Sequence, residues 1–327
     1  RCLVGSEMCI RDRSWSRCTR RTIFSKSLRQ NFVMEKKSFL SIYAKSFNWA
    51  GFFLPKEIYL KCSNLYDFCR TLDNIADDEG TIDVKLRRFL NFKNNFNNQE
   101  FQNPIIKNMW VLMDEYNIST KIVEDLFDGV ESDIQNEVKL NSKKELLIYS
   151  YRVAGTVGLM MAKILNVTSS NSLKSAIDLG IAMQLTNISR DVIEDSKNKR
   201  FYIKHNFETI KETLATADLF YDSSFSSIKD IPLTLRFSIL VARRVYRQIG
   251  RNIIKKQTIQ NYNKSGKIFV TNIGKILQTI LSIFDLVKLS LIKKHNHLRD
   301  KEHKLIIEEI NLDAVSYTHL TLPTRIF

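Results

Sequence analysis

The chain has 327 residues, of which 44% are hydrophobic and 26% are charged, and its formal net charge is +15 at pH 7. This composition is typical of a globular protein and excludes an intrinsically disordered chain. It contains only ten glycines and four prolines, which argues against an all-β sandwich with many tight turns and favours long helices joined by few loops.

Both ends of the chain look foreign to the fold. Residues 1–33 carry a net charge of +6 and show no amphipathic period. An organelle transit peptide has a similar composition, but the stretches 1–13 and 315–324 resemble translated sequencing-adaptor remnants. We therefore predict a non-native or disordered leader over 1–33, one domain over 34–314, and a non-native tail over 315–327.

The charge of the central part points to anionic partners. Without residues 1–33 and Arg325 the net charge falls from +15 to +8. That value still favours partners such as diphosphates or lipid head groups. The basic residues are scattered and form no nucleic-acid-binding motif, so we expect no nucleic-acid partner.

The first half of the domain shows helical spacing of its apolar residues. Two helices are predicted between about 38 and 78, with Pro55 at the break between them. The Asn-rich stretch 91–104 is predicted to be a loop or a frayed helix end. The remaining predicted helices of this half cover 105–137 and 143–165, the latter interrupted by Gly155 and Gly158.

The second half is predicted to be helical as well. A loop at 166–172 carries good N-cap residues, and from 173 to 195 the apolar period is close to 3.6. Further helices are predicted at about 208–218, 233–256 and 268–292. Since there is no internal repeat and no convincing strand, we predict a single all-α domain.

The stretch 268–292 is the one segment that suggests a membrane. A spanning helix needs about 20 mostly apolar residues, but Lys275, Asp285 and Lys288 interrupt this run. We predict an amphipathic helix whose apolar side faces the core. A helix lying on a membrane surface is the alternative.

The cysteine, histidine and glycine patterns exclude several kinds of site. The cysteines at positions 2, 9, 18, 62 and 69 are odd in number and form no CxxC pair, so neither a disulfide framework nor a zinc site is indicated. A reducing compartment is therefore expected. The chain has no HExxH, GxGxxG or Walker motif, which argues against zinc hydrolysis and a dinucleotide-binding domain.

Two polar stripes stand out in otherwise apolar helices. Tyr66, Arg70, Asp73 and Asp77 are spaced so that all four lie on one helix face. The same holds for a second stripe, which consists of Gln184, Asn187, Asp191 and Asp195.

Each stripe ends in two aspartates one turn apart, which repel each other. A cation should compensate, and Mg²⁺ prefers such hard oxygen ligands together with substrate phosphates. The alternative interpretation is two solvated acidic faces.

Other residues suit a diphosphate site with an apolar chain attached. Arg70 and Arg190 would donate charge-assisted hydrogen bonds to phosphate oxygens, although Arg190 is also placed to pair with Glu194 at i+4. The small residues at 154–156 and 158 suggest the wall of a cavity for a long apolar chain. Tight helix packing is the alternative explanation.

Four motifs, at 66–78, 128–134, 151–161 and 184–203, resemble those of the squalene/phytoene synthase family. The resemblance covers about 40–290 and is strongest to the bacterial phytoene synthases. It implies an all-α, single-domain class I isoprenoid synthase fold, a helical bundle around a central apolar cavity.

The resemblance also implies roles for individual residues. Asp73, Asp77, Asn187, Asp191 and Asp195 would bind Mg²⁺ or Mn²⁺, with Arg70 and Tyr66 completing the catalytic set. The substrate would contact Ser46, Phe47, Ala154, Val157, Gly158, Gln184, Asn187, Arg190, Arg200, Tyr202, Tyr262 and Lys267. Phe47 or Phe68 would stabilise carbocations in the pocket.

The implied activity is that of a prenyltransferase in carotenoid biosynthesis. It condenses two geranylgeranyl diphosphates head to head into 15-cis-phytoene through prephytoene diphosphate, without NADPH. One alternative is the C15 reaction, which gives squalene, dehydrosqualene or presqualene diphosphate. The other is a non-catalytic assembly or scaffold relative, against which the two complete aspartate pairs argue.

The same resemblance implies where the protein works and with what. Its substrates would be prenyl diphosphates, and a carotenoid-pathway desaturase would be a partner. We expect a cytoplasmic protein with peripheral contact to the inner face of the cell membrane.

Overall fold

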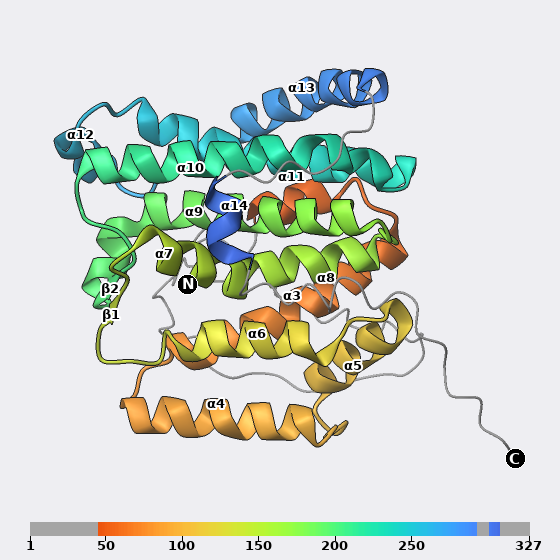
Figure 1. The fold of residues 1–327 in the computed structure, drawn as a ribbon, viewed down its shortest axis with the longest axis vertical. Coiled ribbons are helices and arrows are strands. Elements are labelled where there is room, and N and C mark those ends of the chain that lie inside the picture. Colours follow the sequence, from red (N-terminus) through yellow and green to blue (C-terminus); the bar gives the residue numbers. More distant parts are fainter. Residues whose placement is uncertain (1–44, 293–300, 308–327) are drawn as a thin grey trace, which may run out of the picture.

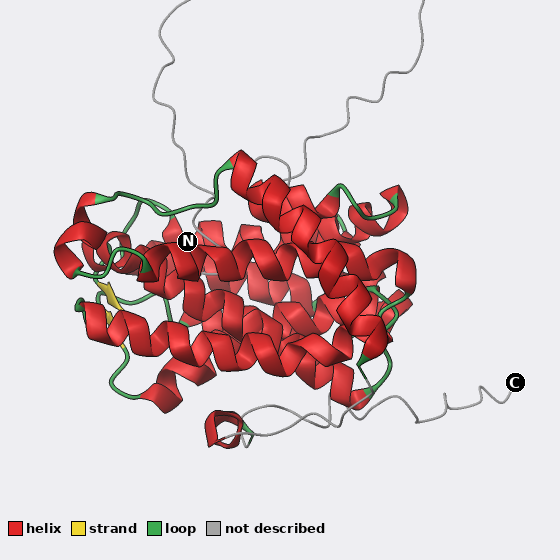
Figure 2. Cartoon of the chain, turned by 90° about the horizontal axis from the view of Figure 1, so that it is seen from above, coloured by secondary structure: helices red, strands yellow, loops and turns green. Residues whose placement is uncertain are grey.

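The computed structural model describes residues 45–292 and 301–307, and nearly all regular structure in these ranges is helical (Figure 1, Figure 2). The predicted all-α fold is confirmed. The predicted leader over 1–33 and tail over 315–327 lie outside the described residues.

The chain begins with α2 and α3 on either side of Pro55, as predicted. In order, the elements are α2 (Lys45–Gly51), α3 (Lys56–Asp77), α4 (Ile82–Asn97), α5 (Pro104–Tyr116), α6 (Thr120–Glu131), β1 (Val138–Lys139), α7 (Lys143–Ser150), η2 (Tyr151–Gly155), α8 (Thr156–Ile164), α9 (Ser170–Lys197), β2 (Arg200–Phe201), α10 (Phe207–Phe225), η3 (Ser226–Asp230), α11 (Leu233–Ile254), α12 (Ile259–Lys264), α13 (Asn272–Leu291) and α14 (Lys301–Ile306).

The Asn-rich stretch is more helical than its composition suggests. The prediction of a loop or frayed end over 91–104 is wrong for residues 91–97, because α4 continues to Asn97. The reason is that Phe89, Phe92 and Phe96 form one buried face of this helix. The Phe96 ring stacks on Trp110 at a centroid distance of 5.2 Å, and this burial outweighs the poor helix propensity of asparagine.

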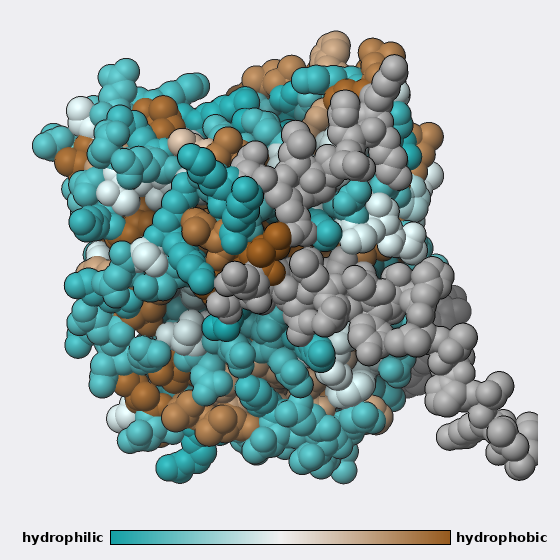
Figure 3. Space-filling model, viewed as in Figure 1, coloured by the Kyte–Doolittle hydropathy of each residue, from teal (hydrophilic) through white to brown (hydrophobic). Residues whose placement is uncertain are grey.

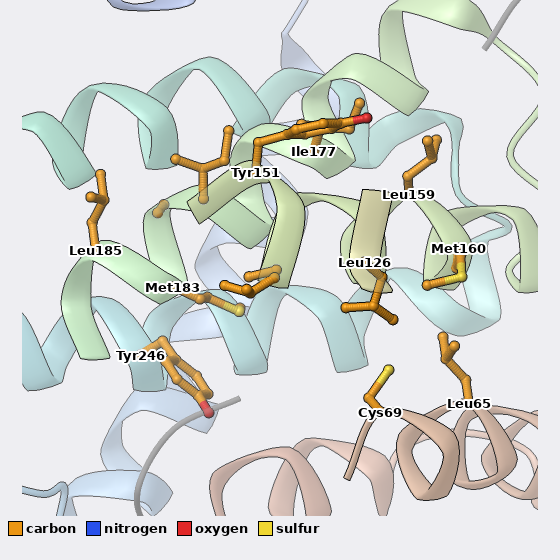
Figure 4. Packing of buried hydrophobic residues seen from close by; sticks show 14 of the residues in the cluster. Leu65, Cys69, Leu126, Tyr151, Leu159, Met160, Ile177, Met183, Leu185 and Tyr246 are labelled. Carbon is orange, nitrogen blue, oxygen red and sulfur yellow. The ribbon is translucent and has the colours of Figure 1, made fainter. Parts of the chain in front are cut away.

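Helix α9 forms the centre of the molecule. It packs against α8, α10, α11 and the π-helical segment η2. Figure 4 shows Ile177, Met183 and Leu185 of α9 in the buried cluster with side chains from the neighbouring helices. Because α9 is covered on most sides, its polar stripe lies inside the protein rather than in solvent.

Two glycines allow α9 to approach the preceding helix closely. A Cβ on Gly180 would lie 2.2 Å from the carbonyl oxygen of Ala154, and one on Gly158 would lie 2.3 Å from that of Ala176. Real Cβ atoms do not come so close, so larger residues would force the helices apart. Close helix packing is therefore one reason for the small residues of this segment.

Two very short strands pair with each other, one between α6 and α7 and the other directly after α9. β1 and β2 are parallel, with Val138 paired to Arg200 and Lys139 to Phe201. The prediction of a chain without strands is wrong to this extent. The pairing fixes the backbone directly after α9 and thereby places Arg200.

Helix α13 lies in the opposite orientation to the predicted one. Its buried residues are Lys275, Gln278, Ser282, Asp285 and Leu289, while its apolar side chains are exposed. The prediction that its apolar side faces the core is wrong, because polar partners on α11 hold the polar side inward. Within 45–292 and 301–307, no helix is both long and apolar enough to cross a bilayer.

Candidate functional site

The first acidic pair lies in the last turns of α3. Asp73 is buried and accepts a hydrogen bond of 2.6 Å from Arg70 on the same helix face. Asp77 accepts one of 2.7 Å from Arg200 of β2. Each carboxylate is thus held by a guanidinium, the donor whose geometry suits a carboxylate or a phosphate.

The second acidic pair lies near the end of α9 and is fully buried. Both carboxylate oxygens of Asp191 accept from the neighbouring Arg190, at 3.1 and 3.0 Å. Burial raises the pKa of Asp195 well above its usual range, and the negative charge of Asp191 raises it further. A buried carboxyl in this position favours either a proton or a cation.

Arg200 connects the two acidic pairs. It bonds directly to Asp77 on α3, and its positive charge opposes the rise in the pKa of Asp195 on α9. The two stripes therefore face one shared region, as the sequence predicts for helices that form one site.

Next to Arg200 lies a buried cluster that the sequence analysis did not predict. Asp133 accepts hydrogen bonds from the hydroxyls of Tyr202, at 2.6 Å, and Tyr149, at 2.8 Å. The two tyrosine rings are stacked at 4.7 Å. Burial raises the pKa of Asp133, and Arg200 opposes this rise. The sequence does contain an indication of this residue, because Asp133 belongs to the motif at 128–134.

An apolar cavity begins at the second stripe. Gln184 and Asn187 lie at its polar end, and Ser172 lies on the same helix at the other end. At 1.5 Å per residue, the distance along α9 from Asn187 to Ser172 is about 22 Å. The predicted wall residues Phe47, Ala154, Val157 and Gly158 all line this cavity, so the small residues serve both close packing and a cavity wall.

Phe68 does not line the cavity. Its ring lies between 5.4 and 6.0 Å from the rings of Phe92, Phe96 and Phe127, in the core. The expectation that Phe68 stabilises carbocations is therefore not supported by its position, whereas Phe47 is placed at the cavity.

The remaining predicted residues surround the acidic region in different ways. The Tyr262 hydroxyl donates to the backbone oxygens of Ser189 at 3.0 Å and Arg190 at 2.8 Å, so it supports α9 at the second pair. Lys267 donates to Glu194 at 3.0 Å. Tyr66 is buried, which raises the pKa of its hydroxyl. Ser46 belongs to α2, but its side chain lies outside the described part of the structure.

The donor atoms of the site suit a hard divalent cation. The Oδ1 atom of Asn187 is buried without a hydrogen-bond partner, and it lies one turn from Asp191 on the same helix face. Carboxylate and amide oxygens are the ligands of Mg²⁺. In residues 45–292 and 301–307, however, no three carboxylate, histidine or cysteine side chains converge on one point, because arginines hold three of the four aspartates.

Comparisons with known proteins agree with this site. The profile of the family described as squalene/phytoene synthase matches residues 41–203. A 15-cis-phytoene synthase from Paracoccus sp. is 34% identical over 174 residues, which are 46% of this chain and 57% of that protein. The match thus spans less than two thirds of that relative's length. A phytoene synthase from Pseudescherichia vulneris is 29% identical over 57% of this chain and 71% of that protein.

A solved structure shows a similar fold. A dehydrosqualene synthase in complex with a ligand has a TM-score of 0.62 and 25% identity, over 77% of this chain and 95% of that one.

Proposed function

The chain belongs to the squalene/phytoene synthase family, and we infer that it is a prenyltransferase of the phytoene synthase type. We propose that it joins two geranylgeranyl diphosphates head to head and forms phytoene through prephytoene diphosphate. The names of its curated relatives support the product.

The observation that carries this proposal is the junction of two unlike surfaces. An apolar cavity is lined by residues spread over about 22 Å of α9, and its polar end at Asn187 lies one helical turn from the buried pair of Arg190 and Asp191. A substrate that fits both parts has a long hydrocarbon chain and a highly charged anionic head. A prenyl diphosphate has both features.

The charged end would bind and activate the diphosphate. Arg70, Arg190 and Arg200 are placed to donate hydrogen bonds to phosphate oxygens, which stabilises charge that develops as the diphosphate leaves. Since their present partners are aspartates, a cation that took over the aspartates would release the arginines for the substrate.

The family is of the divalent-metal-dependent isoprenoid synthase type, and we propose Mg²⁺ as the ion. The residues that would hold it are Asp73, Asp77, Asn187, Asp191 and Asp195. When bound, it would neutralise charge on the diphosphate oxygens.

The cavity would protect the hydrocarbon part of the reaction. Its wall is mostly apolar, with Ala154, Val157 and Ile231 among its residues, and such a wall would keep water away from an allylic cation. Phe47 lies at the cavity with its ring 5.0 Å from that of Tyr246, and aromatic faces stabilise cations. The double bond of the second prenyl diphosphate would attack the cation and lose a proton, which gives the cyclopropyl prephytoene diphosphate. Departure of its diphosphate, rearrangement and loss of a second proton would give the hydrocarbon.

The C15 reaction is the second candidate, because the solved structure that resembles this fold at a TM-score of 0.62 is named a dehydrosqualene synthase. The two reactions differ in the length of the apolar chain rather than in the charged end. For the phytoene reaction we propose a carotenoid-pathway desaturase as a partner.

The test supplies the purified chain with Mg²⁺ and no NADPH, and offers geranylgeranyl and farnesyl diphosphate separately. A C40 hydrocarbon from the C20 substrate, identified by chromatography and mass, is the expected result. Asp73→Ala and Asp191→Ala should abolish it, while Asp218→Ala, on the exposed side of α10, should not.

Two other results would change the proposal. A product from the C15 substrate alone would assign the chain to the squalene or dehydrosqualene reaction while keeping the site. If neither substrate gave a product and no diphosphate were released, the enzymatic proposal would be refuted in favour of a non-catalytic relative.

A further inference from the structure

Helix α13 exposes its apolar side, which a surface helix of a globular protein normally buries. Eight apolar side chains form what we term the α13 face, and each is about half or more exposed: Ile273, Ile276, Leu277, Ile280, Ile283, Phe284, Val287 and Leu291. Amphipathic helices of globular proteins place such residues against the core. Figure 3 shows apolar residues along the upper edge of the molecule, where Figure 1 places α13.

Polar contacts with α11 fix this orientation. Arg244 donates to both carboxylate oxygens of Asp285, at 2.5 and 2.8 Å. Farther along the same helix pair, Gln278 donates to Gln248 at 3.2 Å. Rotating α13 to bury its apolar side would break this half-buried ion pair, so the exposed apolar side belongs to the fold.

The surroundings of the α13 face are also apolar in part. Phe269, just before the helix, is 56% exposed, and Leu233, at the start of α11, is 65% exposed. Lys229 of η3 donates to the backbone oxygen of Ile292 at 3.0 Å, which brings the start of α11 near the end of α13. Apolar exposure on this scale marks a binding surface.

Basic residues flank this surface. Between 255 and 292 the sequence has six lysines. Of these, Lys275 is buried and Lys267 bonds to Glu194, while those at 255, 264 and 288 are exposed. The one aspartate of this stretch is bonded to Arg244. Lys264 precedes α13 and Lys288 lies exposed near its end. Two further lysines follow at 293 and 294 in the sequence.

We propose that the α13 face docks the protein onto an anionic lipid bilayer, with the helix lying along the surface. Two interactions stabilise such binding: apolar side chains insert at the headgroup boundary, and lysines lie opposite acidic lipids. A second copy of the chain is a poorer partner, because a symmetric contact would bring two lysine-rich borders together. The position would suit an enzyme with a hydrocarbon product.

The test measures co-sedimentation of the full chain with vesicles of phosphatidylcholine, with and without phosphatidylglycerol. Ile280→Ser with Phe284→Ser removes two side chains from the middle of the α13 face without touching the core. The matched control, Phe101→Ser with Val111→Ser, removes two exposed apolar side chains at the other end of the molecule. No substrate is needed, so the result does not depend on the proposed reaction.

We expect the unaltered chain and the control to bind vesicles that contain phosphatidylglycerol, and more weakly those that lack it. The α13 double variant should bind the same vesicles at least about tenfold more weakly. Equal binding by both variants, or no binding by the unaltered chain, would overturn the proposal. So would a dimer in sedimentation equilibrium that the α13 substitutions dissociate, because the face would then be a contact between copies.

Discussion

Replacing Arg200 by glutamine should reveal what holds the two acidic helices together. The side chains of Arg200 and Asp77 are 7% and 20% exposed. Removal of one partner of a buried ion pair typically costs about 3–5 kcal/mol, because the other charge stays buried. Since Asp77 is partly exposed, we expect Arg200→Gln to lose about 3 kcal/mol of unfolding free energy in metal-free buffer.

Mg²⁺ should restore part of this loss. Arg200→Gln removes a positive charge beside the carboxylates of Asp77 and Asp195, and a divalent cation can supply positive charge in its place. At a Mg²⁺ concentration ten times its dissociation constant, binding to the folded state adds about 1.4 kcal/mol. Denaturant unfolding with EDTA and with Mg²⁺ measures both quantities.

The control is an arginine with similar bonding far from the site. Arg247 bonds to Asp218 and Asp222, whose side chains are 53% and 65% exposed. Exposed pairs contribute about 0–1 kcal/mol, so Arg247→Gln should lose little and gain nothing from Mg²⁺. If Mg²⁺ stabilised both variants equally, or if Arg200→Gln were as stable as Arg247→Gln, Arg200 would not be the internal counter-ion of the site.

Three further substitutions test the packing, the buried acid and the cavity. Gly180→Ala gains about 1 kcal/mol of helix propensity but meets the Ala154 oxygen at 2.2 Å, so it should lose about 1–2 kcal/mol net in denaturant unfolding. The control Gly80→Ala should stay near zero, because its Cβ would make only ordinary van der Waals contact with Val84, at 3.8 Å. The pKa of Asp133 is raised in the folded state, so the folded state binds the proton of this carboxyl more tightly than the unfolded state does. The free energy of unfolding should therefore fall as the pH rises from the ordinary aspartate pKa to the raised one. Asp133→Asn should therefore gain stability relative to the unaltered chain over that interval, and a constant difference across pH would contradict this sign. Ser175→Phe fills the end of the cavity far from Asn187. It should reduce turnover of geranylgeranyl diphosphate more than that of farnesyl diphosphate. An equal loss with both would show that this end of the cavity does not determine the chain length of the substrate.

Local periodicity was sufficient to predict the acidic stripes. Spacing along one helix determines which side chains share a face, so Asp73 and Asp77 on α3, and Asp191 and Asp195 on α9, lie where the sequence predicts. Their bonding partners were less predictable. Arg190 bonds to its neighbour Asp191, while Glu194 accepts from Lys267, far along the chain.

Contacts between distant segments could not be predicted from spacing. The cluster around Asp133 joins Tyr149 and Tyr202 from three separate elements, and no local pattern connects them. Tyr262 was expected near the substrate, yet its hydroxyl donates to the backbone of α9, which only the docking of α12 determines.

The orientation of α13 shows a different limit. A helical wheel shows that one side is apolar, but it does not show which side another helix covers. Here the deciding contact is that of Asp285 with Arg244 on α11. A tertiary ion pair therefore reversed the assignment that hydrophobicity alone had favoured.

The π-helical segment η2 bears on how this region tolerates changes in length. Within Tyr151–Gly155 the backbone hydrogen bonds of the π-helix span five residues instead of the four of an α-helix, so this segment contains one extra residue between α7 and α8. Deleting a single residue here would restore a regular helix and rotate all of α7 by about 100° relative to α8. Tyr149 would then turn away from Asp133 while Ala154 stayed beside α9. The extra residue therefore sets the rotation of α7 relative to α8. As a result, Tyr149 can face Asp133 at one end of this helical segment while Ala154 lines the cavity at the other.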